Sequence, residues 1–174
     1  MSEPGTRLLL LAQRLGARLQ AQRRVLVTAE SCTAGGIAFA ITQVPGSSAW
    51  FDRGVIVYSN ESKMRMLAVP AIYLRDFGAV SEPVARSMAL GALQQSSAQA
   101  AIAVTGIAGP DGGTPDKPVG TVCFAFALRR DAAAAPWVQT VTRLFNGDRA
   151  AVRTDAIGHA LEQMNLVLQM HESA

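Results

Sequence analysis

The sequence predicts an α/β protein, a three-layer α/β/α sandwich built around a mixed, largely parallel sheet. Two kinds of segment and their alternation support this fold class. Short runs of β-branched and apolar residues alternate along the chain with longer segments in which apolar residues recur every three or four positions. Such alternation is typical of sheets that helices cover on both faces. With 174 residues, 49% of them hydrophobic, the chain can bury its own core, and we expect a single domain over residues 1–174.

The amino-terminal part of the chain predicts a helix, a strand and a second helix. A stripe of leucines at three- and four-residue steps predicts an amphipathic helix over about residues 5–22. The leucines are Leu8, Leu11, Leu15 and Leu19. The β-branched run at 25–29 predicts the first strand. A tight turn at 31–33 and a helix over about 34–43 are expected next, which would place Ser31 at a helix N-terminus.

The middle of the chain carries further strand and helix signals. Ser59 and Asn60 are favoured N-cap residues, and they follow a hydrophobic run. Ser81 repeats the cap signal, with Pro83 in the first helical turn. We therefore expect, in order, a buried strand at 54–58, a helix at 61–67, a helix from Ser81 to about Gln95 and a third strand at 101–105.

The carboxyl-terminal part predicts a loop, two strands and a closing helix. A glycine-rich loop spans 106–113. The hydrophobic runs at 119–128 and 138–145, joined by an alanine-rich connection at 129–136, predict an antiparallel pair of strands. The closing helix is expected from about Asp148. Its apolar face carries Ile157, Leu161, Met164 and Leu168.

Three segments that are distant in the sequence are expected to meet at one edge of the sheet. If the first three strands are parallel, the residues that follow them emerge together at the carboxyl edge, where open α/β sheets bind ligands. These segments are 31–33, 58–63 and 105–113. The sequence therefore predicts a single site assembled from all three.

Ser31 and Lys63 are the candidate nucleophile and base of this site. Free N–H groups and the positive end of a helix dipole would hold an oxyanion beside Ser31, although position alone favours a simple N-cap. The dipole alone lowers the pKa of Lys63 by less than about one unit from ~10.4, so a general base also requires burial. The alternative is a solvated surface lysine. Direct proton transfer predicts roughly 2.6 to 3.2 Å between hydroxyl and amine.

Other features near this pair allow more than one interpretation. Tyr58 is expected either to hydrogen-bond one member of the pair or to be a strand aromatic with a solvated hydroxyl. Gly35 and Gly36 each cost a helix about 1 kcal/mol relative to alanine, which indicates close approach of a ligand or a strand. The loop at 106–113 offers N–H groups to an anion but lacks the ending of a P-loop, and the alternative is an irregular turn.

Composition and spacing argue against several other functions. The pI near 9.3 accompanies a net charge of only +3, with no basic block longer than two residues, so we expect no nucleic-acid partner. No apolar run approaches the ~18 to 20 residues of a membrane span, so we expect no membrane association and a cytoplasmic location. Cys32 and Cys123 lack metal-ligand spacing and are expected to be buried thiols. His159 lies off the apolar face of the closing helix and His171 lies in the tail, which argues against a zinc site or a Ser-His-Asp triad.

Six ordered blocks of the sequence closely resemble the CinA C-terminal domain family. The blocks are Thr28–Gly36, Gly46–Phe51, Val57–Asn60, Gly78–Val84, Thr105–Gly113 and Lys117–Val122. The resemblance extends from about Leu8 to Leu168 and includes the element Gly147-Asp148-Arg149. Because no amino-terminal partner domain precedes it in this sequence, we expect the stand-alone form of the family, a nicotinamide-nucleotide amidohydrolase.

The resemblance implies hydrolysis of the carboxamide of nicotinamide mononucleotide to nicotinate mononucleotide and ammonia, without a metal or another cofactor. It implies a serine nucleophile, matched by Ser31, and an active-site tyrosine and lysine, matched by Tyr58 and Lys63. We expect the nucleotide to contact Cys32, Thr33, Ser48, Asn60, Thr105, Gly106, Gly109 and Arg149. Where the family commonly has glycine this chain has Ala34, whose methyl group would narrow the helix start. A homodimer is also expected.

Two other functions remain open on the sequence alone. The first is a non-catalytic nucleotide-binding or regulatory module with the same fold and pocket. The second is a structural assembly protein, which would neither bind nor turn over a nucleotide. Ammonia release together with calorimetric binding distinguishes all three.

Overall fold

A five-stranded mixed sheet forms the centre of the protein. The computed structural model describes residues 3–129 and 134–172. The strands are β1 (Leu26–Glu30), β2 (Phe51–Ile56), β3 (Ala100–Gly106), β4 (Thr121–Leu128) and β5 (Trp137–Leu144), in the spatial order β2-β1-β3-β4-β5. β1 pairs in parallel with both β2 and β3, whereas β4 is antiparallel to β3 and to β5. Four strands therefore point in one direction, which confirms the mixed, largely parallel sheet.

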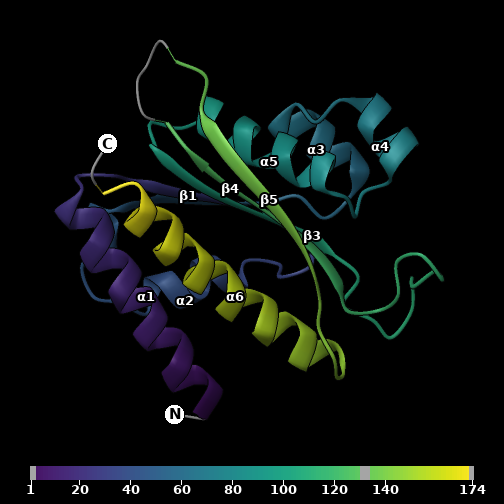
Figure 1. The fold of residues 1–174 in the computed structure, drawn as a ribbon, viewed down its shortest axis with the longest axis horizontal. Coiled ribbons are helices and arrows are strands. Elements are labelled where there is room, and N and C mark those ends of the chain that lie inside the picture. Colours follow the sequence, from purple (N-terminus) through teal and green to yellow (C-terminus); the bar gives the residue numbers. More distant parts are fainter. Residues whose placement is uncertain (1–2, 130–133, 173–174) are drawn as a thin grey trace.

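Helices cover both faces of the sheet (Figure 1). The helices are α1 (Glu3–Ala21), α2 (Gly36–Thr42), α3 (Asn60–Leu67), α4 (Ala71–Phe77), α5 (Glu82–Gln94) and α6 (Arg149–Met170), with a short 3-10 turn at Ser47–Ala49. One core cluster packs α1, α2 and α6 against the sheet, and a second packs α3 and α5 against the opposite face. The expected three-layer sandwich is confirmed.

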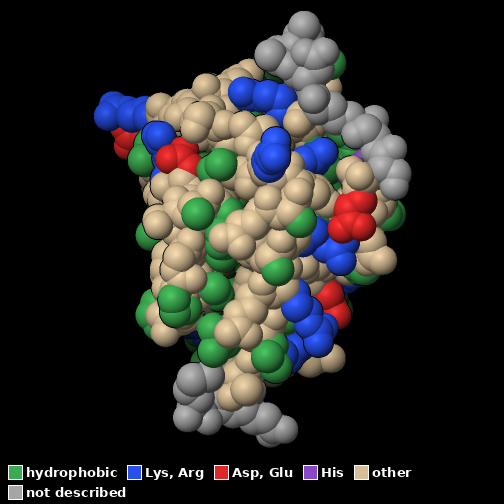
Figure 2. Space-filling model, turned by 90° about the vertical axis from the view of Figure 1, so that its left-hand side faces the viewer, with side chains coloured by type: hydrophobic (Ala, Val, Ile, Leu, Met, Phe, Trp, Pro, Cys, Tyr) green, Lys and Arg blue, Asp and Glu red, His purple; other side chains and the backbone are tan. Residues whose placement is uncertain are grey.

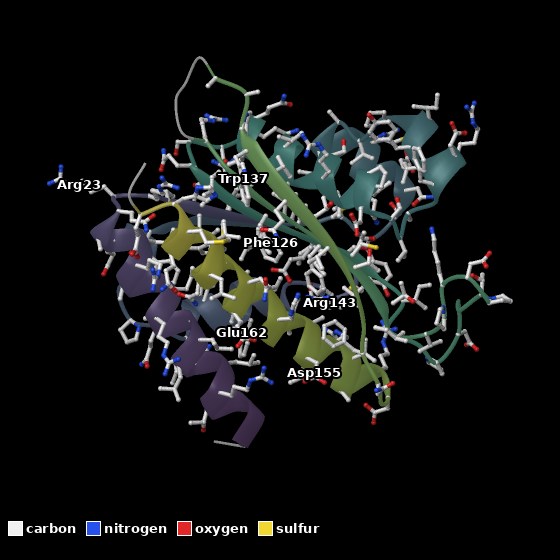
Figure 3. All side chains as sticks on the ribbon, in the orientation of Figure 1. Arg23, Phe126, Trp137, Arg143, Asp155 and Glu162 are labelled. Carbon is white, nitrogen blue, oxygen red and sulfur yellow. The ribbon has the colours of Figure 1, made fainter. Side chains whose placement is uncertain are left out.

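The two core clusters follow from the alternation of side chains along each strand. On β4, Phe124 and Phe126 belong to the cluster under α6, whereas Cys123 and Ala125 belong to the cluster under α5. Figure 3 shows Phe126 in the space between the sheet and α6. Because both faces are covered, every residue of β4 is buried, as the near-continuous apolar run requires.

The structure corrects the sequence prediction at several elements. The strand predicted as buried at 54–58 is β2, which begins at Phe51 and lies at the edge of the sheet, so most of its residues are half-buried or exposed. Helix α4 was not predicted. The helix expected over 34–43 begins only at Gly36. The alanine-rich connection falls partly on residues 130–133, which lie outside the described residues.

His159 is also placed differently from the prediction. Its ring centroid lies 4.8 Å from that of Phe124 and 5.9 Å from that of Phe145, so it packs among aromatic side chains and does not face away from the core. The reason is that α6 packs against both α1 and the sheet, which gives it a broader buried face than one stripe.

Over residues 3–129 and 134–172, no helix is long and apolar enough to cross a membrane. On the face shown in Figure 2, lysine and arginine side chains are interspersed with hydrophobic and acidic ones.

Candidate active site

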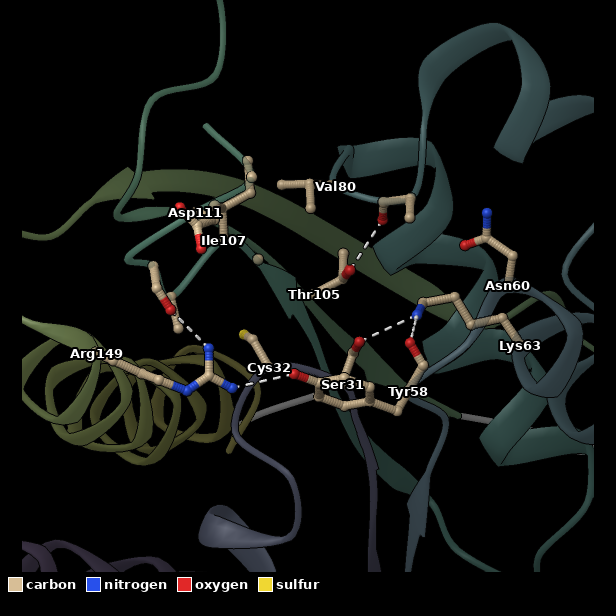
Figure 4. A pocket seen from close by; sticks show the side chains of 15 residues that line it. Ser31, Cys32, Tyr58, Asn60, Lys63, Val80, Thr105, Ile107, Asp111 and Arg149 are labelled. Carbon is tan, nitrogen blue, oxygen red and sulfur yellow. Dashed lines mark hydrogen bonds between the residues drawn. The ribbon is translucent and has the colours of Figure 1, made fainter. Parts of the chain in front are cut away.

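A cavity of about 270 Å³ opens at the carboxyl edge of β1, β2 and β3. Its walls come from the three predicted segments, from the loop before α5 and from the start of α6 (Figure 4). The lining residues are Ser31, Cys32, Tyr58, Asn60, Lys63, Ala79, Val80, Thr105, Gly106, Ile107, Ala108, Gly109, Asp111, Gly112 and Arg149. The parallel strand directions therefore bring distant segments together, as the topology predicts.

Ser31 and Lys63 are in direct contact in this cavity. Lys63 Nζ lies 3.0 Å from Ser31 Oγ, inside the range expected for proton transfer. The amine is also 2.9 Å from the carbonyl oxygen of Val57 and 3.4 Å from that of Tyr58, and it donates to both. Lys63 is only 1% exposed, which excludes the solvated surface lysine.

The surroundings of Lys63 favour its neutral form. Burial of the amine lowers the pKa of Lys63, because the charged form loses its hydration. Carbonyl oxygens only accept hydrogen bonds, so the two N–H bonds of a neutral amine are directed to Val57 and Tyr58. A neutral amine so oriented would turn its lone pair toward Ser31 Oγ, whereas a charged amine would donate a third hydrogen bond to that atom. This geometry fits a base that accepts the serine proton.

Helix α3 places Lys63 through a well-formed amino-terminal cap. Ser59 Oγ accepts a hydrogen bond from the backbone N–H of Ser62, and the Ser62 side chain accepts from the backbone N–H of Ser59. The cap fixes the first turn immediately after β2. Lys63, one residue further, consequently points back toward the end of β1.

Ser31 does not lie at a helix N-terminus, contrary to the prediction. Residues 31–35 form a turn, and α2 begins only at Gly36. The first N–H groups of α2 are already used, because those of Ile37 and Ala38 donate to the carboxylate of Glu30 at 3.0 and 2.9 Å. The helix start is therefore not available to an oxyanion beside Ser31.

Positive backbone φ angles account for the delayed start of α2. Ala34 and Gly35 have φ of 50° and 87°, a left-handed conformation that a right-handed helix does not contain. At Gly36 a Cβ atom would lie 2.4 Å from the Cδ1 of Ile157, so this glycine permits close packing of α6. At Gly35 a Cβ atom would lie 3.1 Å from the Cδ1 of Ile56 on β2, so the expected close approach of a strand holds for Gly35, whereas Gly36 serves a helix contact.

Replacing Ala34 with glycine is expected to stabilise the protein by about 0.5–1 kcal/mol. The left-handed conformation costs an alanine about 1–2 kcal/mol, from which the larger entropy loss of glycine on folding, about 0.5–1 kcal/mol, is subtracted. Ala34 is exposed, so no buried contact is lost. Thermal unfolding should show a midpoint about 1–4 °C higher. The control, Ala17→Gly on the exposed face of α1, should lower it. A comparable decrease in both variants would contradict the strain at Ala34.

Tyr58 and Arg149 form the outer wall of the cavity. The Tyr58 side chain is 60% exposed, and its hydroxyl accepts a hydrogen bond from Arg149 Nη2 at 3.1 Å. Arg149 Nη1 donates to the carbonyl oxygen of Gly109 at 2.8 Å. The expectation that the Tyr58 hydroxyl bonds Ser31 or Lys63 is therefore wrong for this structure. Tyr58 bonds Lys63 through its backbone carbonyl oxygen and not through its hydroxyl.

Most of the other expected contact residues do line the cavity. They are Cys32, Asn60, Thr105, Gly106, Gly109 and Arg149. Burial raises the pKa of the Cys32 thiol to about 12, with the charge of Glu30 acting in the same direction, so Cys32 is a neutral thiol and not an activated one. The Thr105 hydroxyl donates to the carbonyl oxygen of Ala79, which ties the loop before α5 to the end of β3.

Thr33 and Ser48 do not line the cavity, which corrects two expected substrate contacts. Thr33 is fully buried, and its hydroxyl donates to Glu30 at 2.7 Å, so the side chain faces away from the cavity. Ser48 lies in the 3-10 turn before β2, at the amino edge of the sheet. Because the cavity is at the carboxyl edge, the length of β2 separates Ser48 from it.

Sequence reasoning missed Glu30 and the loop before α5. Glu30 ends a fully buried strand and is itself 0% exposed. Its signal was available, because a carboxylate in a buried strand requires several hydrogen-bond donors. Ala79 and Val80 were interpreted only as part of a helix start, although that start lies beside the end of β3.

Comparison of the sequence with known proteins identifies a family and several relatives of this chain. The family model of the CinA C-terminal domain matches residues 9–168. The nicotinamide-nucleotide amidohydrolase PncC of Escherichia coli is 48% identical over 159 residues, which cover 90% of this chain and 92% of that protein. A putative competence-damage inducible protein of Symbiobacterium thermophilum is 52% identical over 163 residues, but the match spans only 38% of its length.

Solved structures of CinA-superfamily proteins have the same fold as this chain. The crystal structure of a CinA-superfamily protein from Klebsiella pneumoniae has a TM-score of 0.87 and 36% sequence identity, covering 94% of this chain and 98% of that one. The likeness extends over nearly the whole of both chains.

Proposed function

Because the chain belongs to the family of the CinA C-terminal domain, we propose that it hydrolyses the carboxamide of nicotinamide mononucleotide to nicotinate mononucleotide and ammonia. The observation that carries the proposal is the buried contact of 3.0 Å between Ser31 Oγ and Lys63 Nζ in a cavity at the sheet edge. A nucleotide-binding module needs no such pair. The 48% identity to an amidohydrolase named for this substrate class supports the choice of substrate.

Ser31 and Lys63 would carry out the reaction in two steps. Neutral Lys63 takes the Ser31 proton as Oγ attacks the carboxamide carbon, and it then gives the proton to the leaving nitrogen, so that ammonia departs and an ester to Ser31 remains. A water molecule then attacks this ester while Lys63 takes the water proton. Lys63 returns that proton to Ser31 Oγ as the acid leaves. The net change is amide plus water to acid plus ammonia.

Backbone groups other than the start of α2 would hold the oxyanion. Glu30 occupies the N–H groups of Ile37 and Ala38. The N–H of the residue after a nucleophile is a common oxyanion donor, and here that residue is Cys32. We therefore assign the Cys32 backbone to this role, which is consistent with a thiol that stays neutral.

The outer wall of the cavity would bind the rest of the nucleotide. Arg149 supplies a fixed positive charge, and the loop over Gly106–Gly112 supplies backbone N–H groups for the ribose phosphate. The Tyr58 hydroxyl accepts from Arg149 and keeps its own proton free to donate, so Tyr58 would position the attacking water or the substrate. Asn60 adds a polar side chain on the opposite wall.

A coupled ammonia assay with nicotinamide mononucleotide tests this function. We expect ammonia and nicotinate mononucleotide to form in equal amounts, with no added metal. Calorimetry under the same conditions separates the alternatives. Binding without ammonia release would favour the non-catalytic module, and neither binding nor release would favour the structural assembly protein.

The pH dependence of kcat/KM should show one basic group with a lowered pKa. The neutral amine of Lys63 is the active form, so kcat/KM should rise with pH and level off above a pKa that burial holds below the ordinary lysine value of about 10.4. The stability of the folded protein should also rise with pH. A lowered folded-state pKa opposes folding below that pKa, and the penalty disappears as the pH rises toward the unfolded value. Steady-state rates between pH 5 and 10 measure this rise, called the basic limb of the pH profile below. A profile that is flat over this range would contradict a lysine base.

A further inference from the structure

We propose that Thr33 is a positioning residue whose hydroxyl and carbonyl are anchored by Glu30 and Arg153, and that this double anchorage fixes the turn presenting Ser31 to Lys63. Glu30, Thr33 and Arg153 are called the turn clamp below. The inference rests on the proposed function, because it concerns the same nucleophile.

The first half of the turn clamp is the carboxylate of Glu30. It is fully buried and accepts four hydrogen bonds. Two come from side chains, Thr28 Oγ1 at 3.1 Å and Thr33 Oγ1 at 2.7 Å, and two from the backbone N–H groups of Ile37 and Ala38. One carboxylate therefore connects the end of β1, the Ser31 turn and the start of α2. A carboxylate with four donors has little freedom to move.

The second half of the turn clamp is Arg153 on α6. Its Nη2 donates to the carbonyl oxygen of Thr33 at 2.9 Å, across 120 residues of sequence. Arg149, one helical turn earlier, binds the carbonyl of Gly109 and the hydroxyl of Tyr58. The first two turns of α6 thus hold both the nucleophile turn and the outer wall of the cavity.

The turn itself has little regular structure to fix Ser31. Its backbone bonds are those of Ser31 N–H to Val104, Ala34 N–H to Ser31 and Gly36 N–H to Thr33, each at 3.0 Å. Ala34 and Gly35 adopt left-handed conformations that the surrounding structure must enforce. Displacing a reacting group by about 1 Å lowers rates by about a hundredfold. The anchors on both sides of Thr33 therefore act on catalysis through Ser31.

Two isosteric variants separate positioning from ordinary stability. Thr33→Val removes the hydroxyl that joins the turn to Glu30. Thr28→Val removes a hydroxyl that is equally buried and bonds the same carboxylate, but from within β1. We expect Thr33→Val to lower kcat at least about tenfold with KM within about twofold, and Thr28→Val to keep kcat within about twofold. Thr33→Ser, which retains the hydroxyl, should restore most of kcat.

The second anchor has its own variant. Arg153→Met removes the donor to the Thr33 carbonyl while keeping an apolar stem, and we expect kcat to fall with little change in KM. The basic limb of the pH profile should keep its midpoint in all these variants, because none of them contacts Lys63. Equal loss of kcat in Thr33→Val and Thr28→Val, or an unchanged kcat in either Thr33→Val or Arg153→Met, would overturn the proposal.

A substrate-independent measurement keeps the two proposals distinguishable. The rate at which a fluorophosphonate labels Ser31 reports how the turn presents the nucleophile, whatever the natural substrate is. If the wild-type chain is labelled but does not deamidate nicotinamide mononucleotide, the proposed function fails, and the turn clamp is judged by the labelling rates of the same variants. A wild-type chain that shows neither labelling nor ammonia release would overturn both.

Discussion

Ser31→Ala is expected to abolish ammonia release from nicotinamide mononucleotide while leaving the fold and substrate binding intact. Without Oγ no ester intermediate forms, and loss of a nucleophile in comparable hydrolases lowers kcat on the order of 10⁴-fold or more. The stability change should be small, because within the described part of the chain Ser31 Oγ bonds only the amine of Lys63, and that amine keeps two carbonyl acceptors. Ammonia release and calorimetry on the same preparation measure the two effects.

The control for this variant is Ser96→Ala. Ser96 donates to the carbonyl of Ala92 near the end of α5 and does not line the cavity, so its loss should leave kcat within about twofold. Residual activity of a few per cent in Ser31→Ala would contradict the assignment and point to another nucleophile. Cys32 is a poor substitute, because with a pKa of about 12 only about one thiol in 10⁵ is ionised near pH 7.

Lys63→Met should lower kcat by about 10²- to 10⁴-fold, the range typical of a lost general base, with a much smaller effect on KM. Methionine fills a similar volume, so the buried site keeps its packing. The carbonyls of Val57 and Tyr58 lose their donor, each at about 1–3 kcal/mol if they stay dry, while the desolvation of the amine is relieved. Circular dichroism should show a folded chain, and steady-state kinetics should show the loss in kcat.

The other lysine of the chain provides a matched control. Lys117 donates to the carbonyl of Phe77 at the end of α4, outside the cavity, and Lys117→Met should keep kcat within about threefold. The double variant Ser31→Ala/Lys63→Met should be no less active than Ser31→Ala, because the two groups act as one unit. Equal losses in kcat and in substrate affinity for Lys63→Met would instead indicate a lysine that holds the substrate.

The sequence was a good guide to the frame of the site. Strand signals before Ser31, Tyr58 and Gly106 placed three segments at one sheet edge, and the structure confirms the parallel pairing of β1 with β2 and β3. The predicted separation of Ser31 and Lys63, roughly 2.6 to 3.2 Å, contains the observed 3.0 Å. Burial of Lys63 was the stated condition for a base, and only the structure supplied it.

Predictions from the sequence were wrong or incomplete where more than one hydrogen-bond partner was available to the same group. A serine followed by small residues fits a helix N-cap, yet the start of α2 is taken by Glu30, and Ala34 and Gly35 delay the helix. For the Tyr58 hydroxyl the sequence allowed either a bond to Ser31 or Lys63 or a solvated position, and it did not indicate the donor Arg149, 91 residues away. Ser48 matched a family block, but it lies in a turn at the amino edge of the sheet, and β2 runs from there toward the cavity at the opposite edge.

By itself, therefore, the amino-acid sequence determined the order of the elements other than α4, most of their apolar faces and the edge at which the reactive residues meet. Periodicity and helix caps record interactions between near neighbours in the chain, and strand direction then fixes which loops converge. The tertiary structure alone decided which donor each buried acceptor receives. Lys63 and Ser31 are 32 residues apart, and Arg153 and Thr33 are 120 residues apart, so their hydrogen bonds exist only after packing has brought the layers together.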